Sequence, residues 1–243
     1  MKHLFACLLT LFVLSASAQS FQWADHIDGY ADITNVESID VDIKGNTYFT
    51  GYSIYTSSPE STTITTSFAT ASFVCGGQEY GFIGSIADDG SLNWFVPFVG
   101  MPADESHGYD VEVDYPHKCV YVCGHYTGRV DFDPTVAVEY PSGFIGNEDG
   151  FLAKYTLAGG LVWVIRIGGN YWSYLNDLAH DDEGNVFTVG VFNGTVDFDP
   201  GFFVHSETSV GDINNHDGFI AKYAPNSSFM WVSVISPVSP PFR

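Results

Sequence analysis

Short runs in which apolar and polar residues alternate recur along the whole chain, separated by turns rich in Gly, Asn, Asp and Pro. Alternation with a period of two is typical of a half-buried β-strand. No segment shows a convincing apolar period of 3.6 residues, so the sequence predicts essentially no helix. In the last third of the chain, strands are expected at 177–181, 186–192, 218–223 and 229–235.

The same order of four strands is expected twice more, at intervals of about 70 residues. The earlier sets lie at 38–42, 47–52, 81–87 and 92–98, and at 110–114, 119–126, 150–155 and 161–167. Trp23, Trp94, Trp163 and Trp231 follow one another 71, 69 and 68 residues apart. A unit repeated at a fixed period buries its apolar face against its neighbours, and a repeated four-stranded antiparallel sheet is typical of a β-propeller blade. We therefore predict an all-β, β-propeller-like array of about three four-stranded antiparallel blades, with repeats at about 24–94, 95–163 and 164–231.

The number of repeats predicts that the array is an incomplete propeller. Propellers usually have four to eight blades, and this chain supplies three. Residues 21–26 also form a strand of the fourth-strand type with no three strands before it. We expect closure to need missing blades or self-association.

The lengths of the connections divide the array into two faces. The turns between first and second strands and between third and fourth strands are short, and leave on one face. The connections near 53–80, 127–149 and 193–217 are long and, with the segments between blades, leave on the other. Because loops carry function on a rigid scaffold, this second face is the expected binding face.

The first 18 residues have the features of a secretory signal peptide. Lys2 and His3 precede an apolar run at 4–14, and small residues at 15–18 end in an Ala-Ser-Ala cleavage site. The run is too short to span a bilayer, and no later segment comes closer. We expect residues 19–243 to form the repeat domain of a secreted or cell-surface protein without a transmembrane segment. Cys7 lies inside the apolar run, which disfavours the alternative of a lipid anchor there.

The charge and the cysteines limit the partners. The chain has 8 Lys and Arg against 29 Asp and Glu, a formal charge of −21, which disfavours nucleic acid and anionic membranes. The acidity either keeps an extracellular protein soluble or favours cations. Cys119 and Cys123 lie four residues apart on one strand, too far to pair with each other, while Cys75 has the spacing to pair with either.

Several motifs carry a resemblance to a known family. Residues 149–155 (DGFLAKY) and 217–223 (DGFIAKY) are each followed by a Trp, and 181–190 ends a strand in Gly. With the Val-Asp-Phe-Asp-Pro elements at 130–134 and 196–200, the chain resembles the seven-bladed β-propeller repeat family of exported bacterial proteins, in its Bacteroidetes-like version. The first repeat departs from this pattern, with Tyr80 and Ser85 in place of Asp and Lys. The resemblance implies the fold and export, and no one activity.

Paired carboxylates in the repeated Val-Asp-Phe-Asp-Pro element are the candidate metal ligands. Alternate residues of a strand point to the same side, so Asp131 with Asp133, and Asp197 with Asp199, would each offer hard oxygen ligands to Ca²⁺. The competing and favoured interpretation is that these Asp residues cap turns. No full calcium-binding loop is present, and no other cofactor is expected.

Aromatic residues between the second and third repeats are the candidate ligand-binding residues. Tyr171, Trp172 and Tyr174 are expected in a loop of the long-loop face, where their rings would stack on a sugar or anchor a protein; the alternative is a plug between blades. The Trp residues that recur once per repeat are interpreted as core. The four histidines near the long loops (His107, His125, His205 and His216) lack metal-binding spacing and are interpreted as solvated loop residues.

Enzyme signatures are missing, which favours a binding role. There is no G-x-S-x-G elbow and no phosphate-binding glycine loop. We predict an exported non-enzymatic propeller that binds a protein or carbohydrate through its acidic long-loop face. The alternatives are a carbohydrate-active hydrolase or lyase, with Asp104 and Glu105 or Glu148 and Asp149 as its carboxylates, and a structural segment of a larger surface protein.

Overall fold

The computed structural model describes residues 33–54, 62–65, 70–73, 79–100, 104–133, 148–210 and 215–237, with side chains outside 62–65 and 70–73. Regular structure in these ranges consists of antiparallel β-strands, with no helix, which confirms the all-β class. It follows that the described residues contain no helix of the length and apolarity that crossing a membrane requires.

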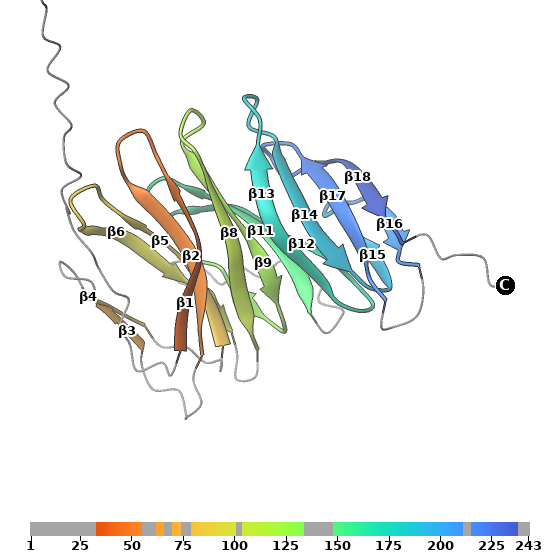
Figure 1. Cartoon of the computed structure of the whole chain (residues 1–243), viewed down its shortest axis with the longest axis horizontal. Helices are drawn as coiled ribbons and strands as arrows, with labels where there is room; N and C mark the ends of the chain where they lie inside the picture. The colour runs from red at the N-terminus through yellow and green to blue at the C-terminus, as the bar shows by residue number, and fades with distance from the viewer. Residues whose placement is uncertain are drawn as a thin grey trace, which may run out of the picture.

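Three sheets stand in a row, and each contains four strands in chain order; the second sheet carries two further short strands at one edge (Figure 1). The first contains β1 (Ile33–Val41), β2 (Thr47–Ile54), β5 (Glu79–Ile86) and β6 (Leu92–Pro97). The second contains β8 (Ser106–Asp114), β9 (Cys119–Tyr126), β11 (Asp149–Thr156) and β12 (Leu161–Gly169). The third contains β13 (Ser173–His180), β14 (Val186–Phe192), β17 (Asp217–Tyr223) and β18 (Phe229–Ile235). The sheets do not close into a ring within the described residues.

The first strand of every sheet begins earlier than the sequence predicts. β1, β8 and β13 were expected to begin at Ser38, Asp110 and Asp177, and they begin at Ile33, Ser106 and Ser173. In each of them the pairing register shifts once, between Val36 and Ser38 in β1 and at the equivalent place in β8 and β13. This β-bulge breaks the alternation of apolar and polar residues, which hid the first half of each strand. The other nine strands of the three sheets lie within two residues of their predicted bounds.

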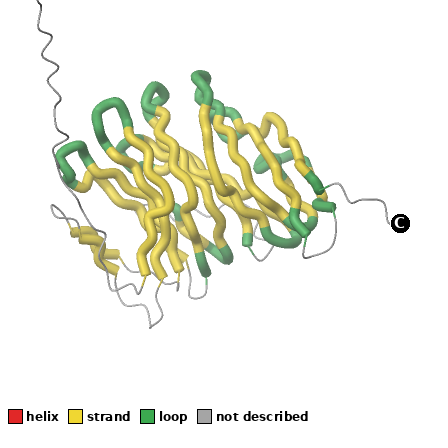
Figure 2. Tube along the Cα trace, viewed as in Figure 1, coloured by secondary structure: helices red, strands yellow, loops and turns green. Residues whose placement is uncertain are grey.

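The two ends of the sheets differ as predicted. At one end, here called the short-turn end, tight turns join first to second and third to fourth strands (Figure 2). At the other, the long-loop end, β8 begins beside the end of β9 and the start of β11, because Ser106 and Asp149 both pair with Tyr126. The long connections leave from this end.

Each interface between sheets is held by a tryptophan. The Trp94 indole N–H donates to the Leu157 carbonyl of the second sheet at 2.9 Å, and the Trp163 indole N–H donates to the Pro225 carbonyl of the third at 3.1 Å. The apolar clusters beneath them join Tyr48 of the first sheet to the second sheet, and Tyr121 of the second sheet to the third. The expectation that the repeated tryptophans pack in the core is confirmed for Trp94 and Trp163, which are half-buried against the apolar clusters, and is wrong for Trp231, which is exposed.

Each of the two Val-Asp-Phe-Asp-Pro elements joins one sheet to the preceding one, and we call each of them a clasp. The first copy forms β10 (Val130–Asp131), which pairs with β7 (Val99–Gly100) directly after β6. The second copy forms β15 (Thr195–Asp197), which pairs with the end of β12 and with β16 (Ser206–Thr208). Phe132 and Phe198 are fully buried, and their carbonyls accept hydrogen bonds from Tyr155 and Tyr223 at 2.7 and 2.9 Å.

The outer faces of the first and third sheets expose apolar residues at positions that are buried where two sheets meet, and no described sheet covers these faces. Ile39 of β1 is 63% exposed, whereas Val111, its equivalent in β8, is 1% exposed. Ile235 of β18 is 60% exposed, whereas Ile167, its equivalent in β12, is fully buried. Apolar residues at these positions are what a further sheet of the same kind would cover.

Some predictions lie outside the described residues. The signal peptide at 1–18, Trp23 with its strand at 21–26, and Cys75 belong to this group. The Ser/Thr-rich run of the first repeat is described only as a backbone hairpin of β3 (Thr62–Thr65) and β4 (Thr70–Phe73). Cys119 and Cys123 are buried and free, which confirms that they do not pair with each other.

Candidate functional site

Histidine and aromatic side chains meet at the long-loop end of the three sheets, because each sheet supplies the same three positions. One position lies near the start of the first strand and holds Asn35, His107 and Tyr174 in the three sheets. Another directly follows the glycine of the second strand and holds Tyr52, His125 and Val191. The last lies at or just before the start of the third strand and holds Glu79, Glu148 and His216. At eight of these nine places the repeat therefore brings a ring or a polar group to the long-loop end, Val191 being the exception.

Between the first and second sheets, His107 is the central residue. Its ring stacks on Tyr52 with centroids 4.0 Å apart and an angle of 13°, and its Nε2 lies 2.6 Å from Glu79 Oε2. The Tyr52 hydroxyl accepts a hydrogen bond from the Asn35 amide at 2.7 Å. His107 is thereby held by stacking and by a carboxylate from the neighbouring sheet.

Between the second and third sheets, Tyr174 has the equivalent place. Its ring lies 4.7 Å from His125, and its hydroxyl donates to Glu148 Oε2. Trp172 stacks on Tyr174 at 5.1 Å and 21°, and lies 5.6 Å from His216. His107 and His125 join the two groups, with centroids 4.8 Å apart. We call the six residues Tyr52, His107, His125, Tyr174, Trp172 and His216 the aromatic–histidine belt.

The three aromatic residues predicted to bind a ligand are only partly brought together. Trp172 and Tyr174 belong to the belt, but Tyr174 lies in β13 and not in a loop as predicted, because the bulge hid the start of that strand. Tyr171 is exposed and packs over Gly194, a glycine with a positive φ of 72° where an added Cβ would lie 2.4 Å from the tyrosine ring. The structure thus places Tyr171 beside the belt.

Burial and acidic neighbours define the electrostatics of the belt. Burial raises the pKa of Glu148, and the charge of Glu105 adds to this, while His107 opposes it. Burial, followed by the charges of Glu148 and Glu37, raises the pKa of Tyr109, which lies 5.4 Å from His125, to about 12. Among the ion pairs of the described residues, none joins a Lys or Arg to Glu148 or to Glu79 of this region.

His125 is the most buried polar side chain of the belt, with 7% of its surface exposed. Burial and the neighbouring His107 lower its pKa to about 3, so its ring is neutral at neutral pH. Its Nδ1 atom has no hydrogen-bond partner among the described residues. A buried, unpartnered ring nitrogen is costly, and a ligand hydroxyl or an ordered water would satisfy it.

The structure corrects the interpretation of the histidines. His107 and His125 were expected in solvated loops, yet both lie in strands and have low exposure. His107 lies in the half of β8 that the prediction missed, whereas His125 lies at the end of the strand predicted at 119–126, next to a long connection. His205 and His216 are exposed, as expected.

The four Asp residues proposed for Ca²⁺ lie in two separate clasps, and three of them, Asp131, Asp197 and Asp199, act as caps of turns. Asp131 accepts a hydrogen bond from the Asp133 backbone N–H at 2.9 Å, and Asp197 accepts those of Asp199 and His205. Asp199 accepts the Gly201 N–H at 2.8 Å. In the described ranges, no three His, Cys, Asp or Glu side chains are grouped as they would be around a metal ion. The favoured turn-cap interpretation therefore describes their contacts.

The other carboxylates considered from sequence have different neighbours. Asp149 is buried and forms an ion pair with Arg166 at 2.7 Å. Asp104 accepts the Arg129 backbone N–H at 2.9 Å. Glu148 belongs to the belt region through Tyr174. Of the four, Glu105 and Glu148 lie close enough for the charge of Glu105 to raise the pKa of Glu148.

The sequence analysis did not identify a row of carboxylates along the first strands of the sheets. Asp40 Oδ2 accepts the Val113 N–H of the next sheet at 2.8 Å, and Asp110 Oδ2 accepts the Leu178 N–H at 2.7 Å. Beside them, burial, followed by the charges of Asp40 and Asp110, raises the pKa of Glu112 to about 7. By strand register Asp40 aligns with Glu112 and Ala179, and Asp110 aligns with Ser38 and Asp177, so no single repeated position marks this row in the sequence.

Comparison with known proteins adds no relative. No protein-family model matches the chain, and no curated protein matches it.

Proposed function

We propose that this protein is an exported, non-enzymatic β-propeller repeat protein that binds its ligand at the long-loop end through the aromatic–histidine belt. The observation that carries the proposal is the continuity of the belt. Six rings from three sheets form one connected row, flanked by carboxylates that no lysine or arginine neutralises among the described residues. A structural interface alone does not require a buried His125 with an unsatisfied nitrogen.

The propeller architecture is supported by the way in which successive sheets pack. Each sheet meets the next through a tryptophan and a clasp at equivalent positions, and through an Asp side chain that accepts a backbone N–H of the next sheet's first strand. The exposed apolar faces of the first and third sheets fit a ring completed by further blades or by a second copy of the chain. Solution mass of the purified chain distinguishes a closed assembly from an open array.

We propose a neutral oligosaccharide as the ligand. Trp172 and Tyr174 offer ring faces on which a sugar ring would stack, and Glu148 and Glu79 offer acceptors for its hydroxyl groups. The belt lacks the basic residues that an acidic ligand would need. A protein ligand remains an outcome that the same experiment detects.

The test is titration of the protein with a panel of neutral oligosaccharides, followed by isothermal calorimetry. For a saccharide that binds, we expect Trp172→Ala to weaken binding at least about tenfold, because it removes the stacking surface. Trp231→Ala is the matched control, since Trp231 is exposed on β18 in the third sheet and outside the belt. Equal affinity of the wild type and Trp172→Ala would contradict the proposal. Absence of binding to any saccharide, together with capture of a protein, would favour the protein ligand.

A second candidate function is glycoside hydrolysis, favoured by Glu112. A carboxyl group with a pKa of about 7 is suited to act as a general acid, and Asp40 and Asp110 lie close enough to raise it. Hydrolysis of oligosaccharides that is lost in Glu112→Gln would support this candidate. Binding without turnover supports the non-enzymatic proposal, and absence of both leaves a structural segment.

A further inference from the structure

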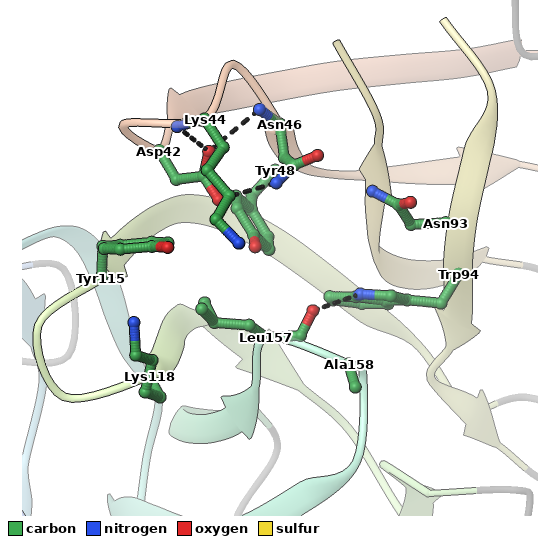
Figure 3. Close-up of a pocket in the computed structure, with 10 residues that line it drawn as sticks. All are labelled: Asp42, Lys44, Asn46, Tyr48, Asn93, Trp94, Tyr115, Lys118, Leu157 and Ala158. Atoms are coloured by element: carbon green, nitrogen blue, oxygen red, sulfur yellow. Dashed lines mark hydrogen bonds between the residues drawn. The ribbon is translucent and has the colours of Figure 1, made fainter. Parts of the chain in front are cut away.

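A second cavity lies at the short-turn end, between the first and second sheets (Figure 3). Its volume is about 530 Å³, enough for a molecule the size of one sugar or aromatic ring. Trp94, Asn93 and Tyr48 line it from the first sheet, and Tyr115 lines it from the turn between β8 and β9. The cavity is at the opposite end of the sheets from the belt.

Two lysines converge on this cavity in a chain that has 8 Lys and Arg against 29 Asp and Glu. The ammonium groups of Lys118 and Lys44 lie 3.8 and 5.9 Å from the centroid of the Tyr115 ring. Figure 3 shows both amines directed toward the space beside that ring. Neither lysine forms an ion pair within the described part of the chain. The cavity therefore holds two positive charges that no described carboxylate side chain binds.

The carboxylate in the wall of the cavity is already occupied. Asp42 Oδ1 accepts the backbone N–H groups of Lys44 and Asn46 at 2.8 and 3.0 Å, and Oδ2 accepts the Asn46 side-chain amide at 2.8 Å. These bonds hold the turn between β1 and β2. They leave the lysine ammonium groups available to a ligand.

The other repeats show that the fold does not require these lysines. Lys118 has a positive φ of 59°, at the turn position where the first and third repeats have Gly45 and Gly184, with φ of 85° and 75°. Side chains other than glycine rarely adopt this conformation. Lys44 stands where the third repeat has Glu183, an acidic residue. The turns therefore accommodate glycine at the position of Lys118 and a negative charge at the position of Lys44. Both positions nevertheless carry lysine at the interface between the first and second sheets.

The place between the second and third sheets that is equivalent to this cavity is crossed by hydrogen bonds. The Tyr121 hydroxyl, equivalent to that of Tyr48, donates to the Gly184 carbonyl at 3.0 Å. Lys154 donates to the Pro225 carbonyl at 3.2 Å, so that lysine is used within the protein. The open cavity is therefore a property of the first interface in the described residues. Lys44 there interacts with Asp42 through its charge and Lys118 lies over the Tyr115 ring, but neither lysine forms an ion pair.

We propose that this cavity binds a small molecule that carries an oxyanion group, a carboxylate or a sulfate or phosphate ester, on a ring. Lys44 and Lys118 hold the oxyanion through charge-assisted hydrogen bonds, and the ring of the ligand lies toward Trp94 and Asn93. The site is independent of the belt, and it gives an acidic protein a place for an anionic ligand that its net charge otherwise repels.

The test uses calorimetric titration of the whole protein with D-glucuronate, glucose 6-phosphate, inorganic sulfate and D-glucose at low ionic strength. We expect at least one of the two sugar anions to bind and glucose not to bind. Affinity should fall as salt is added, because salt screens the lysine charges. Sulfate binding alone, without either sugar anion, would mean that the ring contributes nothing and would overturn the proposal.

Two variants replace a lysine by the residue that another repeat has at the same position, so we expect both variants to fold. Lys118→Gly installs the residue of the first and third repeats, and Lys44→Glu installs that of the third. We expect each to weaken binding of the sugar anion at least about tenfold, and circular dichroism to stay unchanged. Arg129→Gln, which removes one exposed positive charge from the start of β10, is the matched control and should keep the affinity within twofold.

An equal loss of affinity for the sugar anion in Arg129→Gln would show an effect of net charge and would overturn the proposal. Unchanged affinity in Lys118→Gly and Lys44→Glu would also overturn it. Trp172→Ala distinguishes this site from the belt. It should leave anion binding intact even if the proposed saccharide function fails.

Discussion

Replacement of Phe198 by alanine tests whether the clasp holds the second and third sheets together. Phe198 follows β15, is fully buried, and lies 4.9 Å from Phe219 and 5.5 Å from Phe192 between ring centroids. Its carbonyl still accepts the Tyr223 hydroxyl after the substitution, so the change removes the ring and leaves that bond. Truncation of a buried Phe to Ala costs about 3–5 kcal/mol of unfolding free energy, through lost burial and the cavity that remains.

The matched control is Phe202→Ala in the same connection. Phe202 is 95% exposed, and substitutions at such positions usually change stability by less than about 0.5 kcal/mol. Urea unfolding monitored by circular dichroism measures both variants, with the slope of the transition checked for changes in the denatured state. A loss below about 1.5 kcal/mol in Phe198→Ala, or similar losses in the two variants, would refute the role of the clasp.

Three further predictions follow from other contacts. Burial, with Asp40 and Asp110 nearby, raises the pKa of Glu112 from 4.5 to about 7, so its protonated form favours the folded state; this contribution is present below about pH 4.5 and is lost as the pH rises through 7. Glu112→Gln should therefore match the wild type in urea unfolding at pH 4 and exceed it by about 1–2 kcal/mol at pH 8, a value reduced for partial exposure. Gly124→Ala should destabilise the protein by more than about 2 kcal/mol in the same assay, because the new Cβ would lie 1.8 Å from the His107 carbonyl oxygen. Trp163→Phe removes an indole hydrogen bond across an interface and should cost about 1 kcal/mol in thermal unfolding, whereas Trp231→Phe, at an exposed equivalent position, should cost less than about 0.5 kcal/mol.

The strands were predictable because burial of one face leaves a clear alternation. β9 and β14 were predicted at their observed bounds, since β-branched and aromatic residues fill them and a glycine near the end of each marks the repeat. The first strand of each sheet was shortened in the prediction because its bulge inserts one residue, such as Tyr109 in β8, and shifts the pattern to the other face. A one-residue insertion is invisible to a period of two.

The belt was only partly predictable, because its contacts are made between repeats. Trp172 and Tyr174 attracted attention as neighbouring aromatic residues, whereas His107 and Tyr52 are far apart in sequence and stack only when two sheets pack. The sequence contains a signal for these contacts. Alignment of the repeats on Gly51, Gly124 and Gly190 places Tyr52 and His125 at one position, directly after the glycine.

The lysine cavity illustrates a different limit. The sequence analysis placed the short turns on the face opposite the expected binding face and singled out no residue in them. Only the backbone conformation shows that this lysine occupies a position suited to glycine, and only the packing of two sheets brings it near Lys44.

The most direct test of the central claim, that the long-loop end is the binding surface, is hydrogen–deuterium exchange with and without the tightest-binding neutral oligosaccharide. The account predicts slower exchange at the beginnings of β8 and β13 and at the ends of β2 and β9, where the belt residues lie. Slower exchange confined to the short-turn end, or no change in exchange at the belt while the saccharide is bound, would contradict it.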